Sequence, residues 1–162
     1  ISIKTDKRIN MDFIIDLLHN QIFIAAALGW LVAQVLKTLI HLILTKKFVA
    51  ERMVGSGGMP SSHSATVCAL AAAAGMEYGG GSFEFAICTM LAIIVMYDAM
   101  GVRRETGKQG QVLNEMLEAF TNMGKQISPE AKLKEFVGHT PLQVLMGALL
   151  GIAIAVMVNL LL

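Results

Sequence analysis

The sequence predicts an all-α membrane protein, a bundle of about four transmembrane helices with an additional helix at its cytoplasmic surface. Hydrophobic residues make up 55% of the 162 residues and charged residues only 15%. The mean hydropathy of +0.63 is too high for a soluble domain of this length. Four apolar segments, at residues 21–44, 62–78, 83–100 and 141–162, are separated by polar or glycine-rich stretches. Each is close to the roughly 20 residues that cross a bilayer.

The first 20 residues differ from the rest of the chain. Residues 1–10 are polar and are followed by Met11, so we expect a leader or tag remnant with Met11 as the natural start. Residues 12–20 have apolar side chains at helical spacing and form a short amphipathic lead-in. We therefore divide the chain into an N-terminal tail and lead-in, residues 1–20, and one membrane domain, residues 21–162.

The first span carries three polar side chains, Gln34, Lys37 and His41, spaced so that they share one helix face. Charged side chains within a span usually face the bundle interior or a water-filled cavity. The alternative for Lys37 is that its long side chain extends to the membrane interface.

Small residues predict close helix packing in two of the other spans. Residues 62–78 are rich in Ala and Ser, which let backbones approach, so we expect this helix at the centre of the bundle. Gly147 and Gly151 form a GxxxG pair in the last span. Such a pair serves helix contacts within one chain or between chains, which leaves a homo-oligomer open.

The polar stretch 101–138 contains a further amphipathic helix. Its apolar side chains recur at helical spacing, which suits a helix lying on the membrane or over a site. The commoner alternative is a surface helix that packs on its own protein. The stripe consists of Val112, Leu113, Met116, Leu117 and Phe120.

Charge predicts the orientation. With four crossings, the loops 45–61 and 101–138 lie on the same side, and they carry nine of the 13 Lys and Arg residues. The positive-inside rule then predicts an integral protein of a bacterial cell membrane with these loops in the cytoplasm. The net charge of +1 gives no support to a nucleic-acid partner. This topology brings together at one membrane face Arg52, His63, Asp98, Arg103, Arg104 and His139.

The segment Gly55–Ser64 has the composition of a phosphate cradle. Its glycines leave backbone N–H groups open, and Ser61, Ser62 and Ser64 place hydroxyls at a helix start, where an anion is favoured. His63 adds a group that exchanges a proton near neutral pH. The alternative is a glycine-rich turn with an ordinary serine cap.

Arginine and histidine at the same face point to phosphoryl chemistry. Guanidinium groups bind phosphate oxygens in pairs, one histidine can attack phosphorus, and another can protonate the leaving oxygen. Neither an acidic cluster nor a His–Cys spacing suggests a metal site. We therefore expect no cofactor and metal-independent chemistry.

Three segments resemble the divergent branch of the PAP2 (type 2 phosphatidic acid phosphatase) superfamily, which is related to vanadium-dependent haloperoxidases. They are Gly57–Ser64, Tyr97–Arg104 and Gly138–Pro141. The superfamily pattern has Lys and Arg before a loop, then Pro-Ser-Gly-His, then Arg followed by His and Asp. Here Pro60-Ser61-Ser62-His63 matches the second part, with Ser62 in place of Gly.

The resemblance implies a role for each matching residue. His139 corresponds to the nucleophile that forms a phosphohistidine, and His63 to the acid for the leaving group. The phosphate would be held by Arg103 or Arg104, together with Arg52, Ser61 and Ser62. Lys46 or Lys37 would supply the lysine of the first part of the pattern.

Two departures from the pattern stand out. Residues 105–138 separate the arginine pair from His139, which is a long insertion. Gln143 stands where the pattern has the Asp that orients the nucleophilic histidine. The carboxylates that we expect as substitutes are Asp98, Glu105 and Glu135.

The resemblance implies a metal-independent phosphatase or phosphotransferase that acts on a lipid phosphate such as phosphatidate or a polyprenyl phosphate. Its partners would be the bilayer and a phosphate-bearing lipid or inorganic phosphate. One alternative is a non-catalytic binder or carrier of lipid phosphates. The other is a structural membrane subunit whose polar residues only anchor the topology.

Overall fold

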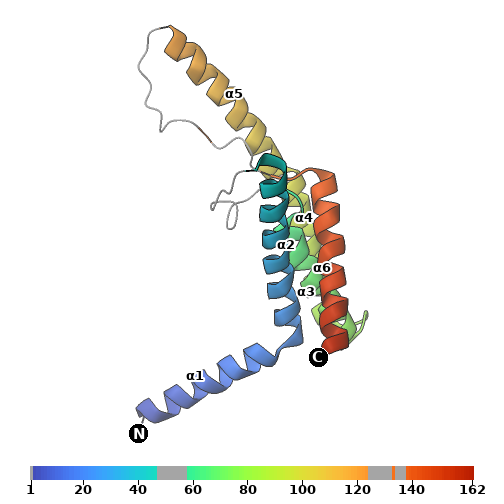
Figure 1. Cartoon of the computed structure of the whole chain (residues 1–162). Helices are drawn as coiled ribbons and strands as arrows, with labels where there is room; N and C mark the ends of the chain where they lie inside the picture. Colours follow the sequence, from blue (N-terminus) through green and yellow to red (C-terminus); the bar gives the residue numbers. More distant parts are fainter. Residues whose placement is uncertain (1, 47–57, 124–132, 134–137) are drawn as a thin grey trace.

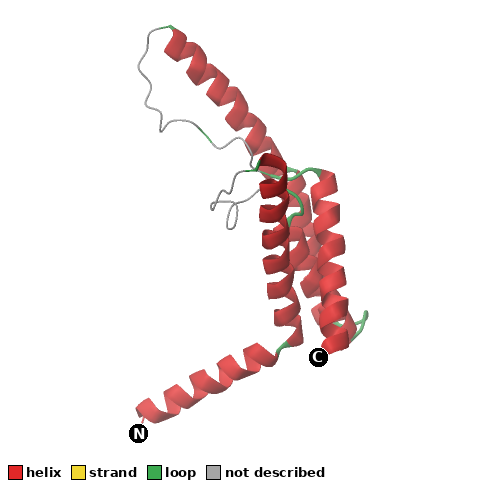
Figure 2. Cartoon of the chain, viewed as in Figure 1, coloured by secondary structure: helices red, strands yellow, loops and turns green. Residues whose placement is uncertain are grey.

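The computed structural model describes residues 2–46, 58–123, 133 and 138–162, and every regular element in these ranges is an α-helix (Figure 2). The all-α prediction is confirmed. The helices are α1 (Ser2–His19), α2 (Gln21–Thr45), α3 (Ser62–Tyr78), α4 (Phe83–Met100), α5 (Val102–Asn122) and α6 (Pro141–Leu161).

Four of these helices, α2, α3, α4 and α6, lie side by side as a bundle (Figure 1). The predicted central position of α3 is confirmed, because α3 contacts α2, α4 and α6. Its Ala65 and Ala69 are fully buried, and a Cβ on Gly29 of α2 would come within 3.0 Å of the Ala65 carbonyl oxygen. The small residues of α3 therefore allow its backbone to pack closely against its neighbours.

Length and apolar composition would let three stretches of described helix cross a membrane: Gln21–Thr45, Phe83–Asn122 and Pro141–Leu161. With 17 residues α3 is shorter, and it lies among the other bundle helices. The outer surface of the bundle is apolar, with Ile87, Met90 and Ile94 of α4 at least half exposed. An apolar surface of this extent suits contact with lipid chains.

Each bundle helix begins at a residue that can cap it. The side-chain oxygens of these residues accept hydrogen bonds from backbone N–H groups in the first turn, which otherwise have no partner within the helix. The caps are Asn20 for α2, Ser61 for α3, Ser82 for α4 and Thr140 for α6.

The two remaining helices project from opposite ends of the bundle (Figure 1). The first, α1, begins at Ser2, so one helix contains both the polar N-terminal stretch and the predicted amphipathic lead-in. The other, α5, follows α4 after Gly101 and contacts α4 alone among the described helices.

The apolar stripe of α5 is not covered by the bundle. Val112, Leu113, Met116 and Phe120 are each about half exposed. The interpretation of this segment as a helix that packs along its own protein does not agree with the structure of the described residues. The side-chain amide of Asn114, which is buried, donates to the Leu133 carbonyl and accepts from its N–H, both at 2.9 Å.

Candidate functional site

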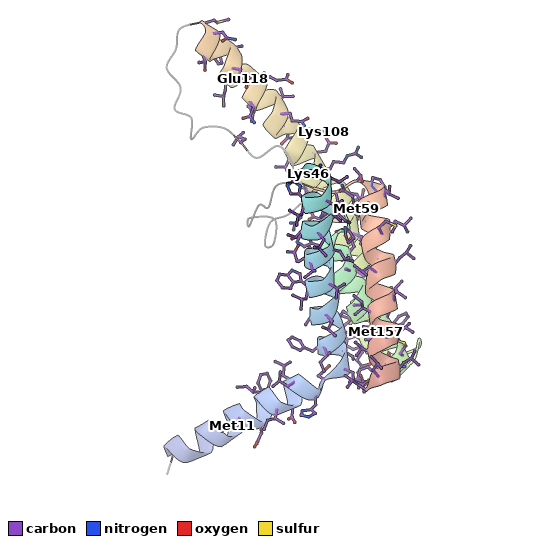
Figure 3. All side chains as sticks on the ribbon, viewed as in Figure 1. Met11, Lys46, Met59, Lys108, Glu118 and Met157 are labelled. Carbon is purple, nitrogen blue, oxygen red and sulfur yellow. The ribbon has the colours of Figure 1, made fainter. Side chains whose placement is uncertain are left out.

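The predicted site residues that the structure describes lie at or near the end of the bundle where α3 and α6 begin and where α2 and α4 end. Lys46 and Met59 mark this end in Figure 3, and Met157 lies toward the opposite end. The alternating helix directions bring segments that are far apart in the sequence to one face.

His139 is held against the junction between α4 and α5. Its backbone N–H donates to the Ala99 carbonyl at 3.0 Å, and the residue is only 3% exposed. The preceding Gly138 has a φ of +95°, and a Cβ there would collide with the backbone of Arg103 and Arg104. Glycine therefore allows the chain to return from the insertion close to the arginine pair.

Gln143 determines which nitrogen of His139 carries the proton. The Gln143 side-chain oxygen Oε1 accepts from the Thr140 N–H at 3.0 Å, as part of a capping box at the start of α6. The same oxygen lies 3.3 Å from Nδ1 of His139. Because an amide oxygen can only accept, Nδ1 must be the donor, and Nε2 of the neutral imidazole keeps its lone pair.

His63, at the start of α3, faces this imidazole. The two ring centroids are 6.2 Å apart, and the ring planes are inclined at 59°, so the rings are not stacked. Reacting atoms approach to about 3 Å before a bond forms, so a phosphate near both rings could meet one histidine at phosphorus and the other at its leaving oxygen. The arrangement suits a nucleophile and an acid on opposite sides of a phosphate.

The charged groups close enough to act on both histidines are Lys37 and Arg103, and Asp98 acts on His63. Burial lowers the pKa of His139 below its ordinary value of 6.5, and the hydrogen bond to Gln143 opposes this effect. The charges of His63, Lys37 and Arg103 lower this pKa further. His139 is therefore neutral at pH 7, as a nucleophile must be.

Lys37 lies inside the protein, 2% exposed. Its Cγ and Cδ would lie 3.0 and 3.1 Å from a Cβ on Gly58, so its aliphatic stem packs directly on this glycine. The alternative in which Lys37 extends to the interface does not agree with this burial.

Ser61, at the start of α3, has a structural role. The Ser61 hydroxyl accepts from the Ser64 N–H at 3.3 Å and from the Ser64 hydroxyl at 3.0 Å. The Ser61 N–H donates to the Gln143 carbonyl at 3.0 Å, which joins α3 to α6. Ser61 thus caps α3 and connects the two helices. Ser62, the next residue, is also buried.

The structure also shows which of the arginines and candidate carboxylates lie near the histidines. The Arg103 Nε donates to Asp98 at 2.6 Å. Both arginines are exposed, and Arg103 is the one whose charge acts on the two histidines. Glu105 pairs with Lys108 on the exposed surface of α5. Lys46 is exposed at the C-cap of α2. Arg52 and Glu135 lie outside the described residues.

No described group of three or more His, Cys, Asp or Glu side chains is arranged to hold a metal ion. Two contributors were missed from the sequence, the capping box and the Ala99 carbonyl. The capping box has a readable signal, because Thr140 is followed three residues later by Gln143. The Ala99 contact has none, because it joins residues 40 positions apart through their backbones.

Comparison with known proteins shows the family of the chain. The sequence model of the divergent PAP2 family matches residues 18–154 of this chain. The chain belongs to this family. The uncharacterized membrane protein YuiD of Bacillus subtilis (strain 168) is 38% identical over 146 residues, which are 85% of this chain and 92% of that protein. No solved structure matches the chain. Family membership and the apolar helices together establish a membrane protein of the divergent PAP2 family.

Proposed function

We propose that this divergent PAP2 protein is a metal-independent phosphatase or phosphotransferase that acts on a lipid phosphate through a phosphohistidine at His139. The observation that carries the proposal is the hydrogen bond from His139 Nδ1 to Gln143, which leaves Nε2 unprotonated beside His63. The ligand would be phosphatidate, a polyprenyl phosphate or another lipid phosphate, because the site lies at the end of an apolar bundle.

In the first step Nε2 of His139 attacks phosphorus, the N–P bond forms and the ester P–O bond breaks. The departing alkoxide takes a proton from the His63 imidazolium. In the second step His63 accepts a proton from water, which attacks phosphorus, breaks the N–P bond and releases phosphate. A lipid hydroxyl in place of water would give phosphoryl transfer.

The groups that would hold the phosphate are all donors. Arg103 supplies a permanent positive charge and Lys37 an amino group that donates hydrogen bonds. Ser62 supplies a hydroxyl in the first turn of α3, where the helix dipole favours an anion. Arg52 remains a proposed ligand from the preceding loop, and Arg104 an alternative to Arg103. A bound phosphate anion would in turn stabilise the imidazolium form of His63.

A second candidate function is a non-catalytic binder or carrier of lipid phosphates. Gln143 favours it, because an amide orients His139 without supplying the negative charge that stabilises a phosphohistidine. In a serine-protease triad, replacing the orienting Asp by its amide lowers kcat about 10⁴-fold. The binder would keep the cradle and lack efficient turnover.

The test measures phosphate release from phosphatidate and from a polyprenyl phosphate in mixed micelles, with the purified full chain. We expect release by the wild type, none by His139→Ala, and release lowered by about 10²–10⁴-fold in His63→Ala. His19→Ala, at the far end of the bundle, is the matched control and should behave as wild type.

Turnover that persists in His139→Ala would contradict the phosphohistidine mechanism. Tight binding of vanadate or inorganic phosphate without turnover would support the binder. If the protein binds no anion, and if His63→Ala and Arg103→Ala change neither binding nor phosphate release, the protein is a structural membrane subunit.

A further inference from the structure

A buried amide on α2 lies below the proposed phosphate cradle. Gln34 is 6% exposed, and its side-chain oxygen Oε1 is shielded from solvent with no hydrogen-bond partner in the described part of the chain. Its backbone carbonyl accepts from the Thr38 hydroxyl at 2.8 Å, so the backbone is satisfied and the side-chain acceptor is not. Buried acceptors are nearly always paired, and an orphan of this kind points to a missing partner.

Contacts along α2 place Gln34 level with the first turn of α3. Gly29 packs against Ala65 and Ala69, and Lys37 packs against Gly58. Because α2 and α3 run in opposite directions, Gln34 lies along α2 between the levels of these two contacts. Gln34 is also one helical turn from Lys37, on a neighbouring part of the same side of α2. The orphan acceptor is therefore next to the lysine whose charge acts on both histidines.

The amide oxygen adds a chemistry that the other ligands lack. Lys37, Arg103 and the N–H groups of α3 donate hydrogen bonds, and they bind any tetrahedral oxyanion. Among oxyanions, only one that carries a hydroxyl can donate a hydrogen bond to this acceptor. Inorganic phosphate near neutral pH retains a P–OH group, and a phosphate monoester retains one below its second pKa of about 6. Sulfate has none at these pH values.

We propose that Gln34 is a specificity-determining residue of the phosphate site, whose Oε1 accepts a hydrogen bond from P–OH. The site thereby selects a protonated phosphate over oxyanions without a hydroxyl. This inference rests on the proposed phosphate-binding function and adds to it the protonation state of the ligand. For a lipid monoester, the selected form is the monoanion.

The experiment titrates the purified full chain with inorganic phosphate and with sulfate at pH 7 by calorimetry. We expect wild type to prefer phosphate by about tenfold or more, the effect of one hydrogen bond to a buried acceptor. Gln34→Met, which has a similar shape and no acceptor of comparable strength, should lose this factor for phosphate and keep its affinity for sulfate. Gln34→Glu restores an acceptor and should retain the preference. Val35→Ala, on the exposed side of the same turn, is the matched control and should bind as wild type.

Equal affinity of wild type for the two anions, or a preference that survives in Gln34→Met, would overturn the proposal. The wild-type comparison and Gln34→Glu decide the question even if Gln34→Met does not fold. If wild type binds neither anion, it is the proposed function that fails. Phosphate binding without discrimination rejects the role of Gln34 alone.

Discussion

Gln143 performs two tasks with one oxygen atom. It accepts from the Thr140 N–H, which caps α6, and from Nδ1 of His139, which sets the tautomer of the proposed nucleophile. An aspartate at the corresponding place in the superfamily pattern would add a negative charge. The amide supplies orientation alone, so the phosphohistidine formed on Nε2 would lack a countercharge at Nδ1. We therefore expect this one residue to separate phosphate binding from efficient turnover.

Gln143→Glu should raise turnover by about tenfold or more, a part of the roughly 10⁴ that the opposite change costs in a protease triad. Glutamate has the length of glutamine and is the preferred partner in a capping box, so both hydrogen bonds should persist. The measurement is phosphate release from a lipid phosphate as a function of pH. Gln109→Glu, the same substitution on the exposed face of α5, is the control.

The pH profile supplies an independent readout of the same change. In wild type, burial lowers the pKa of His139 below 6.5, so the nucleophile stays neutral until the pH falls through that lowered value. A carboxylate beside Nδ1 raises this pKa, and the acidic limb of kcat/KM should move to higher pH. An unchanged limb and unchanged turnover in Gln143→Glu would contradict the orienting role of Gln143.

At the scale of the element, the contact between α3 and α6 sets the distance between the two histidines. His63 lies at the start of α3, and Gln143 holds His139 at the start of α6. The helices approach closely, because Cβ atoms on Gly147 and Gly151 would collide with the carbonyl oxygens of Ser61 and Ala65. The GxxxG pair is therefore used within the chain, on its own α3.

Gly151→Leu should destabilise the bundle and weaken phosphate binding together. The new side chain would have to push α6 away from the backbone of α3, and overpacking of this kind costs about 1–3 kcal/mol or more. The measurements are thermal unfolding in detergent and calorimetric titration with phosphate. Gly80→Leu, in a turn where a Cβ meets nothing within 4 Å, is the control. A Gly151→Leu protein as stable as this control would contradict the close packing of α3 and α6.

At the scale of the whole molecule, alternating helix directions place both site-bearing loops at one end. That end carries most of the Lys and Arg residues of the chain, so the positive-inside rule predicts that the site faces the cytoplasm. The short turn at 79–82 lies at the other end. The predicted orientation of the protein in the membrane depends on the positive charge of the loops and not on any property of the site.

Single-cysteine labelling in intact cells tests this orientation. In a background with Cys68 and Cys88 replaced by alanine, we expect Gly80→Cys to react with a membrane-impermeant maleimide. Lys108→Cys, on the exposed surface of α5 (Figure 3), should react only after the membrane is opened. Detergent-opened cells, in which both should react, are the control. The reverse pattern of labelling would place the site outside the cytoplasm.

Part of this architecture can be read from the order of the residues. Long apolar runs predict the helices, because burying apolar side chains in lipid dominates their placement, and Asn20, Ser61, Ser82 and Thr140 cap them where the runs begin. The alanine content of α3 predicted its central position. The projection of α5 away from the bundle was not predictable from the sequence. Its apolar stripe could pack equally well on a bilayer, on a partner protein or on its own bundle.

The all-helical membrane class and the family follow from the order of the residues alone, since both depend on composition and local motifs. That order also brought the two histidines to one face, since alternating crossings leave no other arrangement. Only the tertiary structure decided which groups lie together at that face. It paired Arg103 with Asp98, buried Lys37 against Gly58, directed Gln143 to Nδ1 of His139 and left the Gln34 oxygen without a partner in the described chain. These are contacts between helices, and they depend on the rotation and depth of each helix, which local sequence patterns do not specify.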